Sequence, residues 1–393
     1  MRQKITFLLI VVVMVVTGIS FAVETIDQDV TSSFARATVL DVKNIKPTGE
    51  NVQYDIMQLV KLQVTSGVLK GQEINTENII SGSYVFDIPV KVGDQVIVQV
   101  DQFNTGETEV FITDFQRDGY LGILVALFVL CLLVIGRLKG LKTVITIGLT
   151  VLLIIKFMLP AVLEGRDPVP VTVISAILIT VTTILFVSGF KKKSFAAIFG
   201  SISGVLIAAL LAFFVGSQIR LTGMSSEEAI MLMNIPQGIQ FNFRSLLFSG
   251  ILLGALGAVM DVAMSIASSI EEVHKANPKL GAMELFRSGM EVGKDVMGTM
   301  SNTLILAYTG SSIPLILLFM AYETPMIRLL NMDLIATEVI RSLAGSVGLI
   351  LTIPLTAMMT VLFISNELDS KKAAPLEEEQ VDTSENISES SAS

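Results

Sequence analysis

Apolar runs of about twenty residues recur along this chain, and they constrain its fold more than any other feature, because a helix of that length crosses a bilayer. Only 16% of the 393 residues are charged, and the mean hydropathy is +0.71. We predict a polytopic α-helical membrane protein with about seven or eight transmembrane helices. The predicted spans lie near residues 5–22, 119–136, 143–160, 170–190, 195–216, 245–268, 300–321 and 343–365.

Basic residues gather in alternate connections between these spans. One set holds clusters, such as the lysines at 191–193 and the basic residues from Lys275 to Lys294, whereas the other holds scattered arginines such as Arg166 and Arg220. Positive charge is retained in the cytoplasm during insertion. We therefore expect a multi-pass protein of the cell (cytoplasmic) membrane with an even number of spans and a cytoplasmic C-terminus.

The first predicted span has two interpretations. Residues 1–23 begin with two basic residues, continue as an apolar run and end in small residues that include Ser20 and Ala22, which is also the pattern of a secretory signal peptide. Cleavage leaves one span fewer than retention as a signal anchor. Both interpretations place residues 24–117 outside the cell.

Residues 24–117 have the pattern of a separate extracytoplasmic β-domain. Short β-rich runs at 37–42, 58–64, 83–88, 94–100 and 109–114 are separated by Gly, Asn and Asp. A turn at Gly93 and Asp94 precedes an alternating strand, as in small barrels. We predict a small OB-like barrel that serves as a structural cap or docks a partner. Nucleic acid is not expected, because basic and aromatic residues are scattered.

The span at 245–268 carries a carboxylate at membrane depth. On a helix, Asp261 shares one face with small and polar residues, whereas the bulky aliphatic residues lie largely elsewhere. A carboxylate at this depth is disfavoured in lipid and should face protein or water. The predicted polar ladder, running from mid-membrane to the cytoplasmic edge, comprises Asp261, Ser265, Ser268, Glu271, Glu272 and His274. The helix-packing residues on the same face are Gly250, Gly254 and Gly257.

Two roles for this ladder stay open. It lines a permeation or proton path, with His274 titrating near neutral pH, or it is a packing seam in which glycines permit close approach and Asp261 hydrogen-bonds a neighbouring helix. The span at 300–321 is unusually polar and is the expected neighbour. Its candidate residues are Asn302, Tyr308 and Thr309.

Further segments surround the predicted bundle at 118–366. Residues 279–298 predict an amphipathic helix that lies in the inner interface or contacts a partner. Ser225 and Glu228 form a capping-box pattern, and Pro314 and Pro354 are expected kinks. Residues 367–393 are acidic and Ser-rich and predict a disordered cytoplasmic tail.

The sequence argues against catalysis, a dedicated metal site and cofactors, and leaves open an oxygen-ligated cation at Asp261, Glu271 or Glu272. It contains one histidine, His274, and one cysteine, Cys131, whereas zinc sites usually draw on several such residues. An aspartyl protease would need a second aspartate at membrane depth, and no Walker-type phosphate loop is present. We expect neither an enzyme nor a cofactor.

The segment 254–272 reads GALGAVMDVAMSIASSIEE. Through this segment, and through the order of a signal or anchor, an exported β-domain and a helical bundle, the chain resembles the YibE/F-like family of bacterial multi-membrane-spanning proteins. The resemblance covers nearly the whole chain. It implies a bacterial inner-membrane protein and supports the predicted topology, and it supplies no mechanism.

Two classes of function remain at this stage. The first is an ion- or proton-coupled transporter or permease in which Asp261 couples or attracts a cation or proton. The second is a non-transporting membrane scaffold or envelope assembly factor whose exported β-domain binds a partner. The lipid bilayer is the expected partner in both, with a membrane-protein partner or a homo-oligomer also open.

Overall fold

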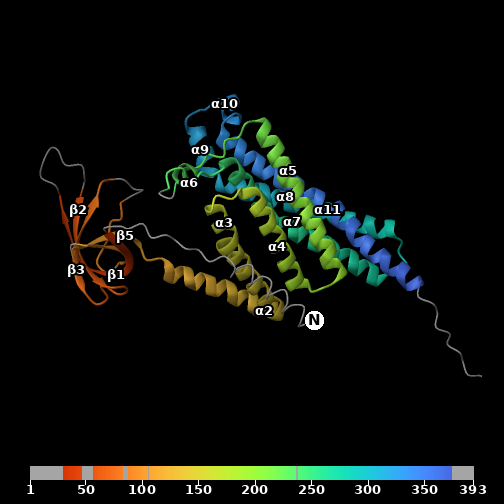
Figure 1. Ribbon diagram of the computed structural model, residues 1–393, viewed down its shortest axis with the longest axis horizontal. Helices are drawn as coiled ribbons and strands as arrows, with labels where there is room; N and C mark the ends of the chain where they lie inside the picture. Colours follow the sequence, from red (N-terminus) through yellow and green to blue (C-terminus); the bar gives the residue numbers. More distant parts are fainter. Residues whose placement is uncertain (1–29, 47–55, 83–86, 105, 236–237, 374–393) are drawn as a thin grey trace, which may run out of the picture. The chain divides into compact units, whose positions relative to one another are not determined.

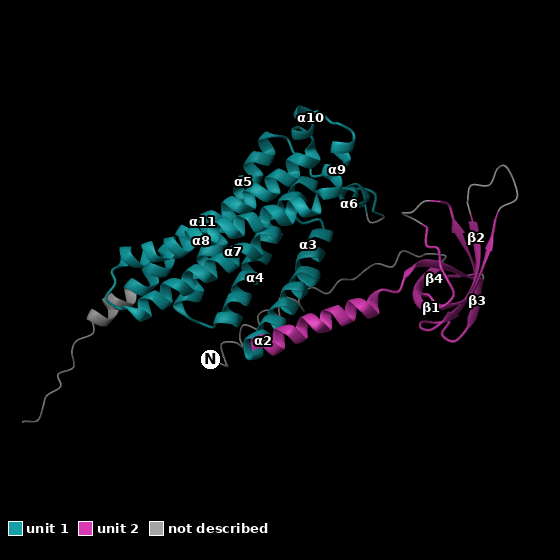
Figure 2. Ribbon diagram, turned by 180° about the vertical axis from the view of Figure 1, so that it is seen from behind, with its two compact units in different colours: residues 1–20, 137–393 teal, residues 21–136 magenta. Residues whose placement is uncertain are grey.

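The computed structural model describes residues 30–46, 56–82, 87–104, 106–235 and 238–373 (Figure 1). They belong to two compact units, one within residues 21–136 and the other from residue 137 onward (Figure 2). The signal or anchor expected at 1–23 lies outside the described residues. So does the tail from 374 to 393.

An antiparallel sheet, with the following helix up to residue 136, forms the unit drawn in magenta in Figure 2. Its strands are β1 (Val30–Ile45), β2 (Ile56–Val64), β3 (Glu73–Ile80), β4 (Gln95–Phe103) and β5 (Thr108–Phe115), in the order β3-β2-β1-β4-β5. The long strand β1 pairs with β4 through its first part and with β2 through its second, with a register shift between Val39 and Asp41. The sheet curls into a half-barrel, and its two edge strands approach one another where Thr76 Oγ1 donates to the carbonyl oxygen of Val110 at 2.5 Å.

Alternation of side chains along the strands builds the core of this half-barrel. On β4, Val96, Val98 and Val100 are almost fully buried, and Val60 and Leu62 on β2 face them. Successive strand residues point to opposite faces, so these aliphatic side chains share one interior. The predicted strands at 37–42, 58–64 and 109–114 are confirmed within longer strands, and the one at 94–100 is confirmed as β4, which begins at Gln95.

The sequence did not predict the third strand, β3 at Glu73–Ile80, and of the run predicted at 83–88 the described Asp87 and Ile88 are not in a strand. Residues 83–86 lie outside the described residues. Strand β3 is rich in polar residues, and its inward Asn78 is satisfied by hydrogen bonds to Gln58 Oε1 at 3.0 Å and to the carbonyl oxygen of Ile88 at 2.8 Å. The predicted turn is present, since Gly93 has φ 91° and Asp94 Oδ2 accepts from the Lys91 amide at 2.8 Å.

Helices form nearly all the regular structure that follows the sheet. They are α2 (Asp118–Leu153), η1 (Ile154–Met158), α3 (Leu159–Leu163), α4 (Pro168–Ser188), α5 (Lys192–Gln218), α6 (Glu227–Leu232), α7 (Phe243–Ala276), α8 (Ala282–Ser311), α9 (Ile313–Ala321), α10 (Met326–Leu330) and α11 (Asp333–Ala373). Five described runs are long and apolar enough to cross a membrane: Asp118–Leu163, Pro168–Ser188, Lys192–Gln218, Phe243–Ala276 and Asp333–Ser365. The α8–α9 pair, bent by 58°, gives a sixth if it is one span.

The chain is thus a multi-pass membrane protein with five or six candidate spans in its described part, fewer than the predicted seven or eight. The spans expected at 119–136 and 143–160 form one run of 46 residues, which is interrupted at Arg137 by a non-helical backbone (φ 48°, ψ −124°). At 1.5 Å per residue this run is about 69 Å long, roughly twice the thickness of a hydrocarbon core.

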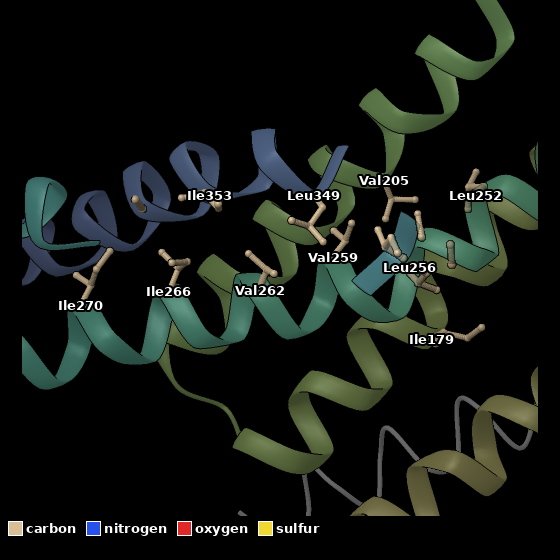
Figure 3. Packing of buried hydrophobic residues seen from close by; sticks show 14 of the residues in the cluster. Ile179, Val205, Leu252, Leu256, Val259, Val262, Ile266, Ile270, Leu349 and Ile353 are labelled. Atoms are coloured by element: carbon tan, nitrogen blue, oxygen red, sulfur yellow. The ribbon is translucent and has the colours of Figure 1, made fainter. Parts of the chain in front are cut away.

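Helix α7 packs one face against α5, α8 and α11 in the helical unit, drawn in teal in Figure 2. Figure 3 shows Val259, Val262 and Ile266 of α7 pointing toward α11, with Leu349 and Ile353 opposite. Small residues bring α11 against α5: a β-carbon at Gly348 would lie 2.6 Å from Ala208 Cβ and 2.7 Å from the carbonyl oxygen of Gly204. These contacts require glycine at 348.

The surrounding segments differ in part from expectation. The amphipathic helix predicted at 279–298 continues without a break into the next span as α8, and its Gly289 and Gly293 contact α7 and α11, so its apolar face meets protein. Helix α6 is capped by Ser226 rather than Ser225. Pro314 follows the bend between α8 and α9, as predicted. Helix α11 continues to Ala373, past the expected end of the bundle at 366.

We predict that Gly348→Ala destabilises the helical unit by about 1–3 kcal/mol, the usual effect of overpacking a close contact. The control is Gly250→Ala on α7, where an added β-carbon would meet no described atom within 4 Å. Thermal unfolding in detergent, followed by circular dichroism, should show a lower Tm for the first variant and an unchanged or slightly higher Tm for the second. Equal Tm values would contradict this account of the α5–α11 contact.

Candidate functional site

Helix α7 has one packed face and one open face. Bulky residues such as Val259, Val262 and Ile266 are fully buried. The face with the predicted ladder is the open one: Asp261, Ser265 and Glu272 are exposed and Ser268 is half-buried. The aliphatic face of α7 therefore packs against other helices, whereas most of its polar face is not covered by them.

A cavity of about 530 Å³ lies along this open face. Its walls come from α2 and η1, from α4 and from α7, and they are mostly aliphatic. Asp261 and Gly257 of α7 form part of the lining. The hydroxyl groups in the lining come from Thr143, Thr146, Thr150, Thr183 and Ser188. A single carboxylate thus lies at the edge of a cavity that is lined by candidate membrane spans and holds several hydroxyl groups.

The carboxylate of Asp261 makes no hydrogen bond and no ion pair within the described part of the chain. Two cavity hydroxyls are likewise free there, because Thr150 and Thr183 donate to no described residue. Hydroxyls both donate and accept hydrogen bonds, and a carboxylate accepts several. Together these groups can hold water or a small cation next to Asp261.

The end of the ladder near residue 272 is already paired. Glu271 Oε2 lies 2.5 Å from Lys193 Nζ on α5, with side chains only 21% and 14% exposed. Glu272 Oε1 lies 2.8 Å from Lys275 Nζ. The Nδ1 atom of His274 is buried and has no partner among the described residues. The structure thus separates Asp261, Ser265 and Ser268, which are available, from two glutamates that are held by lysines.

The ion pair between Lys193 and Glu271 also bears on topology. It joins the start of α5 to the last part of α7, so these two helix ends lie on the same side of the bundle. The charge pattern grouped the lysines at 191–193 with Lys275 on one side of the membrane. The contact agrees with that grouping.

The three ladder glycines differ in their surroundings. A β-carbon at Gly254 would lie 2.4 Å from Tyr308 Oη, so α8 approaches α7 at this point as expected for the polar neighbour. A β-carbon at Gly250 or Gly257 would meet no described atom within 4 Å, so neither glycine has the expected packing role within the described chain. On α8, Asn302 and Thr309 are exposed.

Sequence reasoning missed a second charged site on α11. Glu338 Oε1 accepts from Arg341 Nη1 at 2.6 Å, and both side chains are mostly buried. Glu338 lines a cavity of about 620 Å³ formed by α8 to α11, together with Tyr308 and Thr309. The predicted span began at 343 because these charges interrupt its hydropathy, whereas α11 begins at Asp333. Their spacing of three residues, typical of helix ion pairs, was the available signal.

No group of three or more His, Cys, Asp or Glu residues in the described chain could hold a metal ion. The site on α7 offers a single carboxylate and neutral hydroxyls. Such a donor set suits a proton or a weakly held cation with water better than a dedicated transition-metal centre.

Comparison with protein families gives two matches along the chain. The sequence model of the YibE/F-like protein matches residues 124–366, which is more than half of the chain. The chain belongs to the YibE/F family. The model of the YibE/F family N-terminal domain matches residues 34–115, the half-barrel. Comparisons with curated proteins and with solved structures gave no match. The family therefore covers both units and confirms the resemblance seen in residues 254–272.

We predict that Glu271→Gln destabilises the protein by about 1–3 kcal/mol, because it leaves the largely buried Lys193 without its charged partner. The adjacent Glu272→Gln is the control, since its pair with Lys275 is exposed and worth about 0–1 kcal/mol. Thermal unfolding of both variants in detergent checks the difference. A double-mutant cycle with Lys193→Met should give a coupling free energy of at least about 0.5 kcal/mol, and independent effects would contradict the pairing.

Proposed function

We propose that this YibE/F family protein is an ion- or proton-coupled transporter or permease in which Asp261 is the coupling carboxylate. The observation that carries the proposal is the carboxylate of Asp261, which has no described partner and lies beside a hydroxyl-containing cavity within candidate membrane spans. In this proposal the protein moves a solute and has no enzymatic activity.

Electrostatics supports a wet or ion-binding environment for Asp261. An ionised carboxylate in hydrocarbon is disfavoured by several kcal/mol, and intramembrane carboxylates usually face a bundle interior or a water-filled cavity. The cavity of about 530 Å³ has room for many water molecules, and its hydroxyls supply partners for them. A proton or cation at Asp261 would neutralise its charge, which is how a carboxylate couples an ion to the movement of a helix bundle.

The proposed topology has seven or eight spans, both ends in the cytoplasm and an OB-like barrel outside. Two observations support it. The 46-residue run Asp118–Leu163 is long enough for two crossings and is interrupted at Arg137. Strand β1 pairs with both β2 and β4 while the edges of β3 and β5 approach one another, an arrangement that suits a partly open five-stranded OB barrel.

The alternative proposal is a non-transporting scaffold or envelope assembly factor. It is favoured by the run Asp118–Leu163, in which the most apolar stretch of 18 residues contains no buried residue. The surface of that stretch is available to a membrane partner. Here the half-barrel binds an envelope component and the bundle serves as its anchor. Water access to Asp261 separates the two proposals.

We predict that single cysteines at positions 257, 261, 265 and 268, in a Cys131→Ala background, react with a water-soluble maleimide in intact cells or inverted vesicles. Two controls bracket this result. Val262→Cys lies on the buried face of α7, and Leu124→Cys is exposed on the apolar part of α2; neither should react. Transport is contradicted if positions 257, 261, 265 and 268 are as unreactive as Leu124→Cys in folded protein.

We further predict that Asp261→Asn lowers cation or proton flux into proteoliposomes, measured with an ion- or pH-sensitive dye. Losing one charge-assisted contact of about 1.5–3 kcal/mol corresponds to a fall of roughly tenfold or more. Asp261→Glu keeps the charge and should retain part of the flux. Equal flux for the wild-type protein and Asp261→Asn would remove Asp261 from the mechanism.

A further inference from the structure

The half-barrel is fixed to the first turn of α2 within the same compact unit. Arg36 on β1 forms an ion pair with Asp118, the first residue of α2. The amide of Gln116 donates to the carbonyl oxygen of Gln95 at 2.8 Å. Arg117 Nη1 lies 2.7 Å from Asp114 Oδ1. The half-barrel is therefore held to the start of α2 by the ion pair from β1 and to the residues just before α2 by contacts from β4 and β5.

Asp118 also marks a membrane boundary. It begins the candidate span Asp118–Leu163, and the backbone of that run is interrupted at Arg137. The helix between these points is about 28 Å long, close to the thickness of about 30 Å of a hydrocarbon core. Tyr120, in the first turn, is 82% exposed, as is usual for a Tyr at a membrane interface. Side chains packed around Asp118 therefore lie at headgroup depth.

A hollow of about 340 Å³ opens at this junction. Phe34 lies at its rim on β1 and is 67% exposed. Arg36, Arg117 and Asp118 also line it, and we refer to these four residues as the junction face. A phenyl ring left this exposed in water is unfavourable, whereas the same ring among lipid headgroups buries its apolar surface.

The charges near the junction face are balanced. Arg36 pairs with Asp118 and Arg117 pairs with Asp114, so these two ion pairs together carry no net charge. Each guanidinium has five N–H donors, and its side chain remains more than half exposed, so donors are left for a phosphate oxygen. The carboxylates can in turn face an ammonium group. A zwitterionic phospholipid headgroup matches this arrangement better than a strongly anionic surface.

We propose that the junction face binds the bilayer surface beside α2, with Phe34 inserted among the headgroups and Arg36 and Arg117 directed at phosphates. The half-barrel is then a membrane-apposed domain rather than one that moves freely on a tether. This inference concerns lipid binding by the unit at residues 21–136 and does not depend on whether the helical unit transports a solute.

The chain contains no tryptophan, so Phe34→Trp introduces a single fluorescent probe at the junction face. The matched control is Ile79→Trp on β3, where the native side chain is 56% exposed. Ile79 pairs with Met57, which pairs with Ile45 at the other end of β1 from Phe34. The two probes therefore share the domain and a similar exposure but lie at opposite ends of its longest strand.

The full-length variants are reconstituted in phosphatidylcholine vesicles with or without brominated acyl chains. We expect blue-shifted emission from the probe at 34 and loss of roughly half or more of its intensity in brominated vesicles, because an interfacial ring reaches the upper acyl carbons. The probe at 79 should emit as in water and keep its intensity. Adding phosphatidylglycerol should leave both spectra unchanged, since Arg36 and Arg117 are each paired with a carboxylate.

Three outcomes would overturn the proposal. Red-shifted, unquenched emission at 34 would mean that the residue faces water. Blue-shifted emission without quenching by brominated lipid would mean that protein, such as a second copy of the chain, covers it. A strong dependence on phosphatidylglycerol would reject the zwitterionic headgroup as the ligand.

Discussion

Close contact between helices, made possible by small residues, holds the membrane unit together. In lipid, apolar side chains gain little by leaving the surrounding hydrocarbon, so association depends on tight van der Waals packing and on polar contacts between helices. Helices α5 and α11 meet where Gly204 and Ala208 face Gly348. Helix α8 approaches α7 and α11 through Gly289 and Gly293. The aliphatic face of α7 is used in this packing, and its polar face is therefore free to border a cavity.

A different solution stabilises the half-barrel. Its aliphatic interior includes the buried amides of Gln58 and Asn78, and these bond to one another and to the backbone at Ile88 and Val90. Buried amides are tolerated when their donors and acceptors are satisfied. The network ties β2 and β3 to the irregular segment before β4, so residues with no regular pairing of their own are still held in place.

Periodicity predicted those elements in which burial follows the side-chain pattern. Strand β4 alternates, and α7 separates aliphatic from small and polar residues, so the strand and the helix were both predicted. Strand β3 was not, because the polar Asn78 faces inward and is satisfied only by residues distant in sequence. The cavity beside Asp261 was also beyond a single-sequence argument, since its hydroxyls come from α2 and α4. Hydropathy alone missed Glu338 and Arg341, whose charges compensate one another.

The length of α7 has a mechanical consequence. Its 34 residues extend about 51 Å, so roughly 20 Å of unbroken helix exceeds a hydrocarbon core of about 30 Å. Beyond Ile266 it remains in contact with α8, where Gly289 meets Ile270, and α8 in turn meets Ile353 of α11 at Gly293. A continuous helix does not absorb a displacement as a loop does. Because Asp261 and His274 lie on the same unbroken helix, a displacement of the end of α7 near His274 also displaces Asp261.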